Sequence, residues 1–151
     1  MSGRKPRSRS ESDAAAETGE SREPRDRTWC SRVGLAGLLL WLVGGGVLEA
    51  LNGFKVPGYL QDELRREMWT LAHAHGTLFS LACLVLEGRR PPRRADRLFA
   101  AGAVLLPLGF FLGGALHSEP DPGLGIILVP VGGLLAAAAL VTVLAGRRQG
   151  A

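Results

Sequence analysis

Four ionisable side chains lie inside or at the end of long apolar stretches of this chain. Glu49 lies near the end of the first stretch, His73 and His75 lie in the second, and His117 lies near the end of the third. Ionisable groups are costly in a bilayer, so those that occur there usually have a partner or a function. If the stretches are membrane helices that alternate in direction, we expect all four side chains to lie in the same leaflet.

Helical geometry decides which of these side chains can meet. His73 and His75 are two residues apart, about 200° around a helix, so they cannot face the same point. His73 shares its face with small and hydroxyl residues, and we expect it to point into the bundle. The predicted inward constellation is Glu49, His73 and His117, with Asn52 nearby, whereas His75 should face another side.

Three interpretations of Glu49, His73 and His117 are open from the sequence. In the one we favour, Glu49 pairs with His73 as a structural polar plug that fixes helix register. In the second, a neutral imidazole near a carboxylate handles protons or binds a metal ion. In the third, two histidines from facing helices ligate haem iron. The histidines lie at uneven depths, which is a weak metal signature, so we expect no cofactor.

The elements that must position these residues are four uncharged or nearly uncharged apolar runs. They cover about residues 33–51, 68–86, 98–118 and 123–146. Roughly 20 apolar helical residues cross a hydrocarbon core about 30 Å thick, and continuous runs favour helices over a barrel. The sequence therefore predicts an all-α integral membrane bundle of four transmembrane helices over residues 31–148. Residues 1–30 are rich in Arg, Ser and Glu and are predicted to be a disordered tail.

Basic residues outside the runs are unevenly distributed. Fifteen Lys and Arg lie before the first run, between the second and third runs, and after the fourth, against three in the remaining connections. The positive-inside rule then predicts a multi-pass protein of the cytoplasmic (inner) membrane with both termini in the cytoplasm. Anionic lipid accounts for the net charge of +4. We therefore expect the lipid bilayer as a partner and no nucleic acid.

Two cysteines, Cys30 and Cys83, fall toward the cytoplasmic side in this topology. That compartment is reducing, so a disulfide between them is not expected. Neither cysteine has a partner at the spacing of a metal site. The sequence therefore favours a packing role for Cys83.

Small residues indicate where the helices approach one another. The third run contains Gly109-x-x-x-Gly113, and the fourth contains Gly132 and Gly133. Such residues let membrane helices pack closely. We expect them to serve compact packing within the chain, and the alternative is a homo-oligomer or a membrane-protein partner that uses one of these faces.

Two further features predict local structure. Pro107 and Pro130 lie inside the third and fourth runs, where each removes a backbone donor and should kink its helix. Before the second run, Leu60, Leu64 and Met68 recur every four residues between charged residues. That spacing predicts a short interfacial helix leading into the second span.

Short glycine-rich passages carry a family resemblance. They are Ala50-Leu51-Asn52-Gly53, Trp69-Thr70-Leu71-Ala72-His73-Ala74, Leu108-Gly109-Phe110-Phe111-Leu112, Leu124-Gly125 and Pro130-Val131-Gly132-Gly133. Over about residues 34–145 the order of these features resembles the domain-of-unknown-function 423 family of small four-helix membrane proteins. The family usually has His at Asn52, Tyr at Trp69 and Thr at Val129, and His73 is the polar position that matches best. The resemblance implies the fold and the membrane location and no particular activity.

The chain shows no pattern of a conventional enzyme. It has no Ser-His-Asp set, phosphate-binding loop or zinc-protease motif, so no catalysis is expected. The predicted function is a structural or interaction role in the membrane. The alternatives are a bundle that handles protons or small solutes, and metal or haem binding through His73 and His117.

Overall fold

The computed structural model describes residues 28–118 and 120–148, and helices make up most of them. The elements are α2 (Trp29–Gly53), α3 (Pro57–Leu60), α4 (Glu63–Gly88), α5 (Arg93–Ala115), the 3-10 helix η1 (Leu124–Ile127) and α6 (Leu128–Arg148). Four helices are long and apolar enough to cross a membrane, the last span including η1. The predicted all-α bundle of four spans is therefore confirmed. The predicted tail lies outside the described residues, except for its last three positions.

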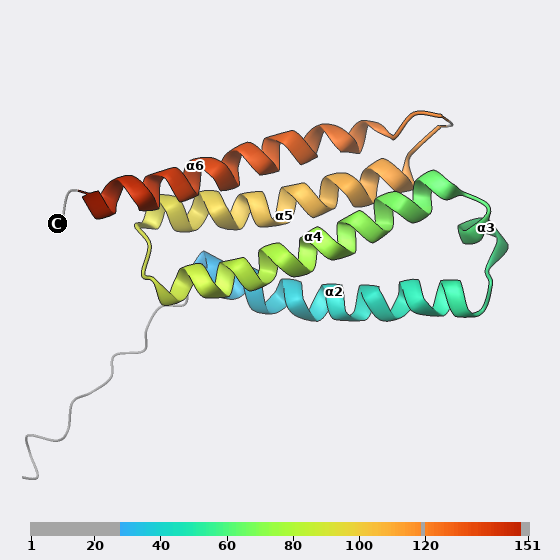
Figure 1. Ribbon diagram of the computed structural model, residues 1–151, viewed down its shortest axis with the longest axis horizontal. Helices are drawn as coiled ribbons and strands as arrows, with labels where there is room; N and C mark the ends of the chain where they lie inside the picture. Colours follow the sequence, from blue (N-terminus) through green and yellow to red (C-terminus); the bar gives the residue numbers. More distant parts are fainter. Residues whose placement is uncertain (1–27, 119, 149–151) are drawn as a thin grey trace, which may run out of the picture.

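The long helices form an antiparallel row rather than a closed ring (Figure 1). In this row α6 packs on α5, α5 on α4, and α4 on α2, while α2 also contacts α5. Within the described residues no contact joins α6 to α2 or to α4. Half of the apolar 18-residue stretch of α5 that could span a membrane is buried, against 6% of the corresponding stretch of α2. The centre of the molecule is therefore α5, and α2 presents most of its surface outward.

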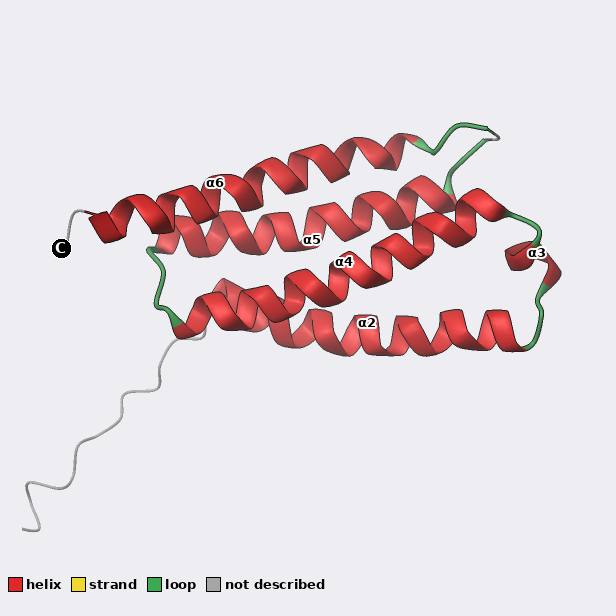
Figure 2. Cartoon of the chain, viewed as in Figure 1, coloured by secondary structure: helices red, strands yellow, loops and turns green. Residues whose placement is uncertain are grey.

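The two ends of the row differ in chemistry. One end, called the arginine end below, holds the start of α2, the connection from α4 to α5 and the end of α6 (Figure 2). Arg89 and Arg90 lie in that connection, and Arg93 and Arg94 begin α5 directly after it. The other end, called the loop end, holds α3 and the turn between α5 and α6. In that turn Ser118 and Asp121 exchange backbone hydrogen bonds of 3.2 and 2.8 Å, so α5 and α6 are antiparallel neighbours.

Glycines allow α5 and α6 to approach at backbone distance. A Cβ on Gly102 would lie 2.6 Å from the carbonyl oxygen of Gly132, and a Cβ on Gly132 would lie 2.6 Å from the nitrogen of Leu106. A Cβ on Gly109 would lie 2.8 Å from the nitrogen of Val129. Real Cβ atoms do not approach that closely, so this seam requires glycine at all three positions.

The other two glycines singled out in the sequence are less constrained. A Cβ on Gly113 would make ordinary contact with Ile126, at 3.5 Å, and one on Gly133 would reach only the Leu106 side chain, at 3.9 Å. Gly113 is nevertheless buried beside η1, whereas Gly133 is half-buried. The close contacts of α5 and α6 therefore depend on Gly102, Gly109 and Gly132.

A tryptophan fills the seam between α2 and α4. The indole of Trp41 lies directly on Gly76, where any side chain would overlap the ring, and the Ser80 hydroxyl occupies the space beside Gly37. A large side chain on one helix thus fits a gap that a glycine leaves on the other. This interlocking sets how far α2 can rotate relative to α4.

A buried carboxylate on α5 caps the N-terminus of α2. The Asp96 carboxylate accepts the backbone N–H of Trp29 at 2.9 Å and that of Cys30 at 3.0 Å. Asp96 is only 5% exposed. The Thr28 hydroxyl accepts a third N–H, from Ser31, at 3.2 Å. Helix starts need such acceptors because their first N–H groups have no partner within the helix.

Two local predictions require correction. Leu64 and Met68 belong to α4 itself, which begins at Glu63 because Asp62 caps it by accepting the N–H of Arg65. The separate short helix is α3, which ends at Leu60. Pro130 lies in the first turn of α6, where a missing N–H breaks no helical bond, because the preceding residues form η1. Pro107 does lie inside α5.

Candidate functional site at the loop end

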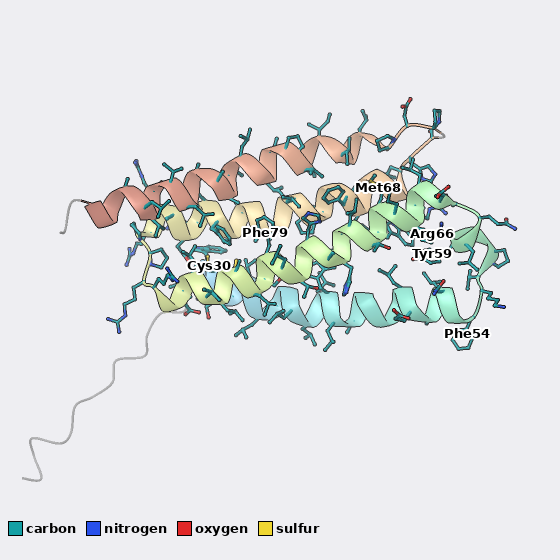
Figure 3. The ribbon with its side chains drawn as sticks, viewed as in Figure 1. Cys30, Phe54, Tyr59, Arg66, Met68 and Phe79 are labelled. Atoms are coloured by element: carbon teal, nitrogen blue, oxygen red, sulfur yellow. The ribbon has the colours of Figure 1, made fainter. Side chains whose placement is uncertain are left out.

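A cavity of about 840 Å³ opens between α2 and α4 at the loop end. Its polar lining residues are Glu49, Asn52, Tyr59, Glu63, Arg66, Glu67, Thr70 and His73. Two of these, Tyr59 and Arg66, are labelled in Figure 3, where they lie beside α3 and the start of α4. The volume falls in the range of small-molecule sites. The cavity therefore combines a large polar space with residues from both helices.

The lining carries an excess of negative charge. Glu49, Glu63 and Glu67 face a single guanidinium, that of Arg66, which leaves a formal charge of −2 when His73 is neutral. Arg66 donates to the carbonyl oxygen of Leu60 at 2.8 Å and lies 4.0 Å from the Glu63 carboxylate. Neither Glu49 nor Glu67 forms an ion pair with any residue that the structure describes. Two carboxylates are therefore available to a cationic ligand.

His73 lines the same cavity deeper along α4, where α2 has no side chain. A Cβ on Gly45 would lie 2.6 Å from Cε1 of His73, so the ring rests against the bare backbone of α2. Its Nδ1 atom is buried without a hydrogen-bond partner, and so is Oγ1 of Thr77 one turn further along α4. An unsatisfied buried polar atom costs about 1–3 kcal/mol and calls for an explanation.

The structure places His117 with other partners. Its Nδ1 lies 2.8 Å from the carbonyl oxygen of Gly114, and its Nε2 lies 3.1 Å from the Asp62 carboxylate. Arg65 approaches the same carboxylate at 3.3 Å. His117 therefore ties the turn after α5 to the start of α4 and does not line the cavity with Glu49 and His73. The partner residue, Asp62, was not among the candidates because it precedes the second apolar run.

His75 lies on the opposite side of α4 from His73, against α5. Its Nδ1 is 2.9 Å from the carbonyl oxygen of Leu71, and its ring is tilted against Phe110 with the centroids 5.0 Å apart. The angular separation expected from the sequence thus gives the two histidines different neighbouring helices. His75 has a packed and hydrogen-bonded environment of its own.

The contacts of Glu49, His73 and His117 can be compared with the polar-plug, metal and haem interpretations. Glu49 and His73 line one cavity, yet no ion pair between them occurs in the described part of the chain. Over the same residues, no three His, Cys, Asp or Glu side chains are grouped as a metal site would need. His73 and His117, considered as a pair of haem ligands, contact different partners.

A second polar cluster, which the sequence did not reveal, lies at the arginine end. Cys30 and Cys83 belong to one buried cluster, and both residues are fully buried and form no disulfide in the part of the chain that the structure describes. The Cys30 thiol donates to the backbone oxygen of Asp96 at 3.4 Å. The two cysteines come from different helices, so spacing along the chain carries no signal of this cluster.

No protein-family model, curated protein or solved structure matches this chain. The resemblance to the domain-of-unknown-function 423 family thus stays a prediction from short sequence passages.

Proposed function

We propose that this multi-pass membrane protein binds a small organic cation with N–H donors in the cavity between α2 and α4. The observations that carry the proposal are two cavity-lining carboxylates that lack ion pairs and a cavity-lining histidine, His73, whose buried Nδ1 lacks a hydrogen-bond partner. A primary ammonium or amidinium group would satisfy both features, because it supplies positive charge and several donors. The proposal involves binding and no covalent chemistry.

Each lining group has a role in this proposal. Glu49 and Glu67 lie at exposed positions and would attract the cation, since carboxylates of one sign around a cleft raise the local concentration of the opposite charge. His73 lies at the deeper position with Nδ1 buried, and a turn of its ring toward the ligand would let Nδ1 accept a hydrogen bond when the proton resides on Nε2. Tyr59, which is 6% exposed, would provide an aromatic wall.

The proposed function also implies which side of the membrane the cavity faces. With the arginine end in the cytoplasm and the protein in the inner membrane, as the positive-inside rule favours, the cavity opens on the opposite side of the membrane. A ligand would then reach Glu49 from outside the cell or from the periplasm. Transfer of the cation or of a proton further inward would pass Thr77, whose hydroxyl also lacks a partner.

The test is titration calorimetry on the protein purified in nanodiscs, with putrescine, tyramine and ethanolamine as ligands and acetate as the anionic control. We expect at least one amine to bind and acetate not to bind. His73→Ala and Glu49→Gln should each weaken that binding about tenfold, the effect of losing one charge-assisted hydrogen bond of about 1.5 kcal/mol. Glu87→Gln changes a carboxylate at the arginine end and should leave binding unchanged.

Two calorimetry results would overturn the proposed binding. If no amine binds, or if His73→Ala binds as tightly as the wild type, the proposal fails. A structural role would then be the better description of the loop end. The contacts that favour that second function are those of His117, which joins Asp62 and the Gly114 carbonyl across two segments of the chain.

A further inference from the structure

We infer that a groove between α2 and α5 binds an anionic phospholipid, with its phosphate on Arg97 and one acyl chain along the groove. This site is separate from the cavity at the loop end and does not depend on the proposed function. Two cavities, of about 500 and 590 Å³, lie between α2 and α5. They share Val33 and Val104, so together they form one continuous groove.

The groove exists because small residues line it. Ala36 and Gly44 on α2 and Ala103 on α5 leave the space open, and Trp41 forms part of its wall. Most of the remaining lining is aliphatic or aromatic, and the groove therefore favours hydrocarbon over water. A hollow of this kind within the bilayer is next to acyl chains.

The dimensions fit one acyl chain better than a helix. From Val33 to Gly44 the groove follows about 17 Å of α2, close to one leaflet, which is about half of a 30 Å hydrocarbon core. The cavity along this stretch of α2, of about 500 Å³, has a mean cross-section of about 30 Å² over that length. A helix about 10 Å across has a cross-section of about 80 Å². A helix of a second copy or of a partner would therefore lie over the groove and not enter it.

The charge at one end of the groove selects the headgroup. Arg97 lines the cavity of about 590 Å³ at the arginine end, together with Trp29. Arg97 is exposed and forms no ion pair with the residues that the structure describes, since the neighbouring Asp96 carboxylate accepts backbone N–H groups of α2. A guanidinium binds phosphate oxygens in a bidentate manner. Trp29, about half exposed, has the place of an interfacial aromatic residue beside a headgroup.

Surrounding charge favours an anionic lipid over a zwitterionic one. Arg93 and Arg94 are exposed in the first turn of α5, one turn before Arg97, and Arg89 and Arg90 precede them. Basic clusters at the membrane surface attract anionic lipid by about 1 kcal/mol for each residue. The groove supplies a hydrocarbon track, and the arginines supply the preference for a negative headgroup.

Trp41 provides the readout, because it lines the groove. A variant with Trp29→Phe and Trp69→Phe keeps Trp41 as its only tryptophan. It is reconstituted in vesicles that contain a small fraction of lipid brominated on the acyl chain, either phosphatidylglycerol or phosphatidylcholine. Bromine quenches tryptophan on contact. We expect brominated phosphatidylglycerol to quench Trp41 at about one tenth of the mole fraction that brominated phosphatidylcholine requires.

Matched variants separate the two parts of the site. Arg97→Gln should remove the headgroup preference, whereas Arg94→Gln, at an exposed arginine outside the cavity lining, should retain most of it. Ala36→Phe fills the groove and should remove the selective quenching, whereas Ala137→Phe, at an exposed alanine of α6, should retain it. The inference is overturned if both lipids quench the parent equally, or if Arg97→Gln keeps the preference.

Native mass spectrometry of the full wild-type chain keeps the test independent of the tryptophan replacements. Extracted with phosphatidylglycerol and phosphatidylcholine in equal amounts, the protein should retain phosphatidylglycerol, and Ala36→Phe should release it. Retention of no lipid would overturn the inference. So would a dimer in which Trp41 is shielded from both brominated lipids, because that result would assign the face to a second copy.

Discussion

Replacing Asp96 with alanine should weaken the junction between α2 and α5 at the arginine end. In the wild type the Asp96 carboxylate accepts the N–H groups of Trp29 and Cys30, at 2.9 and 3.0 Å. Alanine leaves both donors without this acceptor and removes a negative charge from the start of a helix. The first turn of α2 should then fray, and α2 should lose one of its anchors to α5.

The expected loss of stability can be worked out from these contacts. Two hydrogen bonds to a charged acceptor contribute about 1.5 kcal/mol each, and the charge at the helix start adds about 0.5 kcal/mol. Water can reach part of this site, because Trp29 is 53% exposed, and it offsets some of the loss. We therefore expect Asp96→Ala to lower the free energy of unfolding by about 3 kcal/mol, which corresponds to a fall of about 10 °C in Tm.

The assay uses the buried cysteines. Cys30 and Cys83 are both 0% exposed, so a maleimide dye that fluoresces on reaction reports their exposure as the detergent-solubilised protein is heated. Asp121→Ala removes an exposed carboxylate at the loop end and serves as the control. Asp96→Asn keeps one acceptor oxygen and should fall between the wild type and Asp96→Ala. If Asp96→Ala melts together with the wild type, the carboxylate does not anchor α2.

Three further predictions follow from other contacts. Gly76→Ala should destabilise the protein by about 2 kcal/mol in unfolding measurements, because its methyl group overlaps Trp41, and Trp41→Ala should reverse the effect of that methyl group. Cys83→Phe should destabilise the protein by about 2 kcal/mol in unfolding measurements, because Cys83 is 0% exposed and a larger side chain overpacks the core, and Leu81→Phe, at an exposed position of α4, is the control. His117→Ala should speed hydrogen exchange of the turn after α5, because it removes the bond to Asp62; unchanged exchange there would show that the bond does not hold the turn.

The fold class could be predicted from the sequence because transfer of a helix into a bilayer depends on its own composition. Each apolar run crosses the hydrocarbon core by itself, whatever its neighbours are. The bounds were harder to predict: α4 begins at Glu63 and α5 at Arg93, several residues before the apolar runs. Charged residues can start a membrane helix at the interface, where they remain in water, so an uncharged run marks the core of a span and not its ends.

The candidate site could be predicted in part. Glu49 and His73 line one cavity, as their depths and the face of His73 suggested. His117 lies in the same half of the bundle but binds Asp62. Position along a helix gives depth, and depth was the information available for His117. The direction in which its ring points depends on how the turn after α5 folds against the start of α4, which the sequence of that turn alone does not specify.

By itself the sequence determined the number of spans, their apolar character and the concentration of arginine at one end, because these are properties of composition and order along the chain. The tertiary structure decided that the helices form an open row, that Asp96 caps the start of α2 from 66 residues away, and that Cys30 and Cys83 share one buried cluster. It also left a groove between α2 and α5. The physical reason is that such contacts depend on the rotation of each helix about its axis, and that rotation is set by close fits such as Trp41 on Gly76 between residues far apart in the chain.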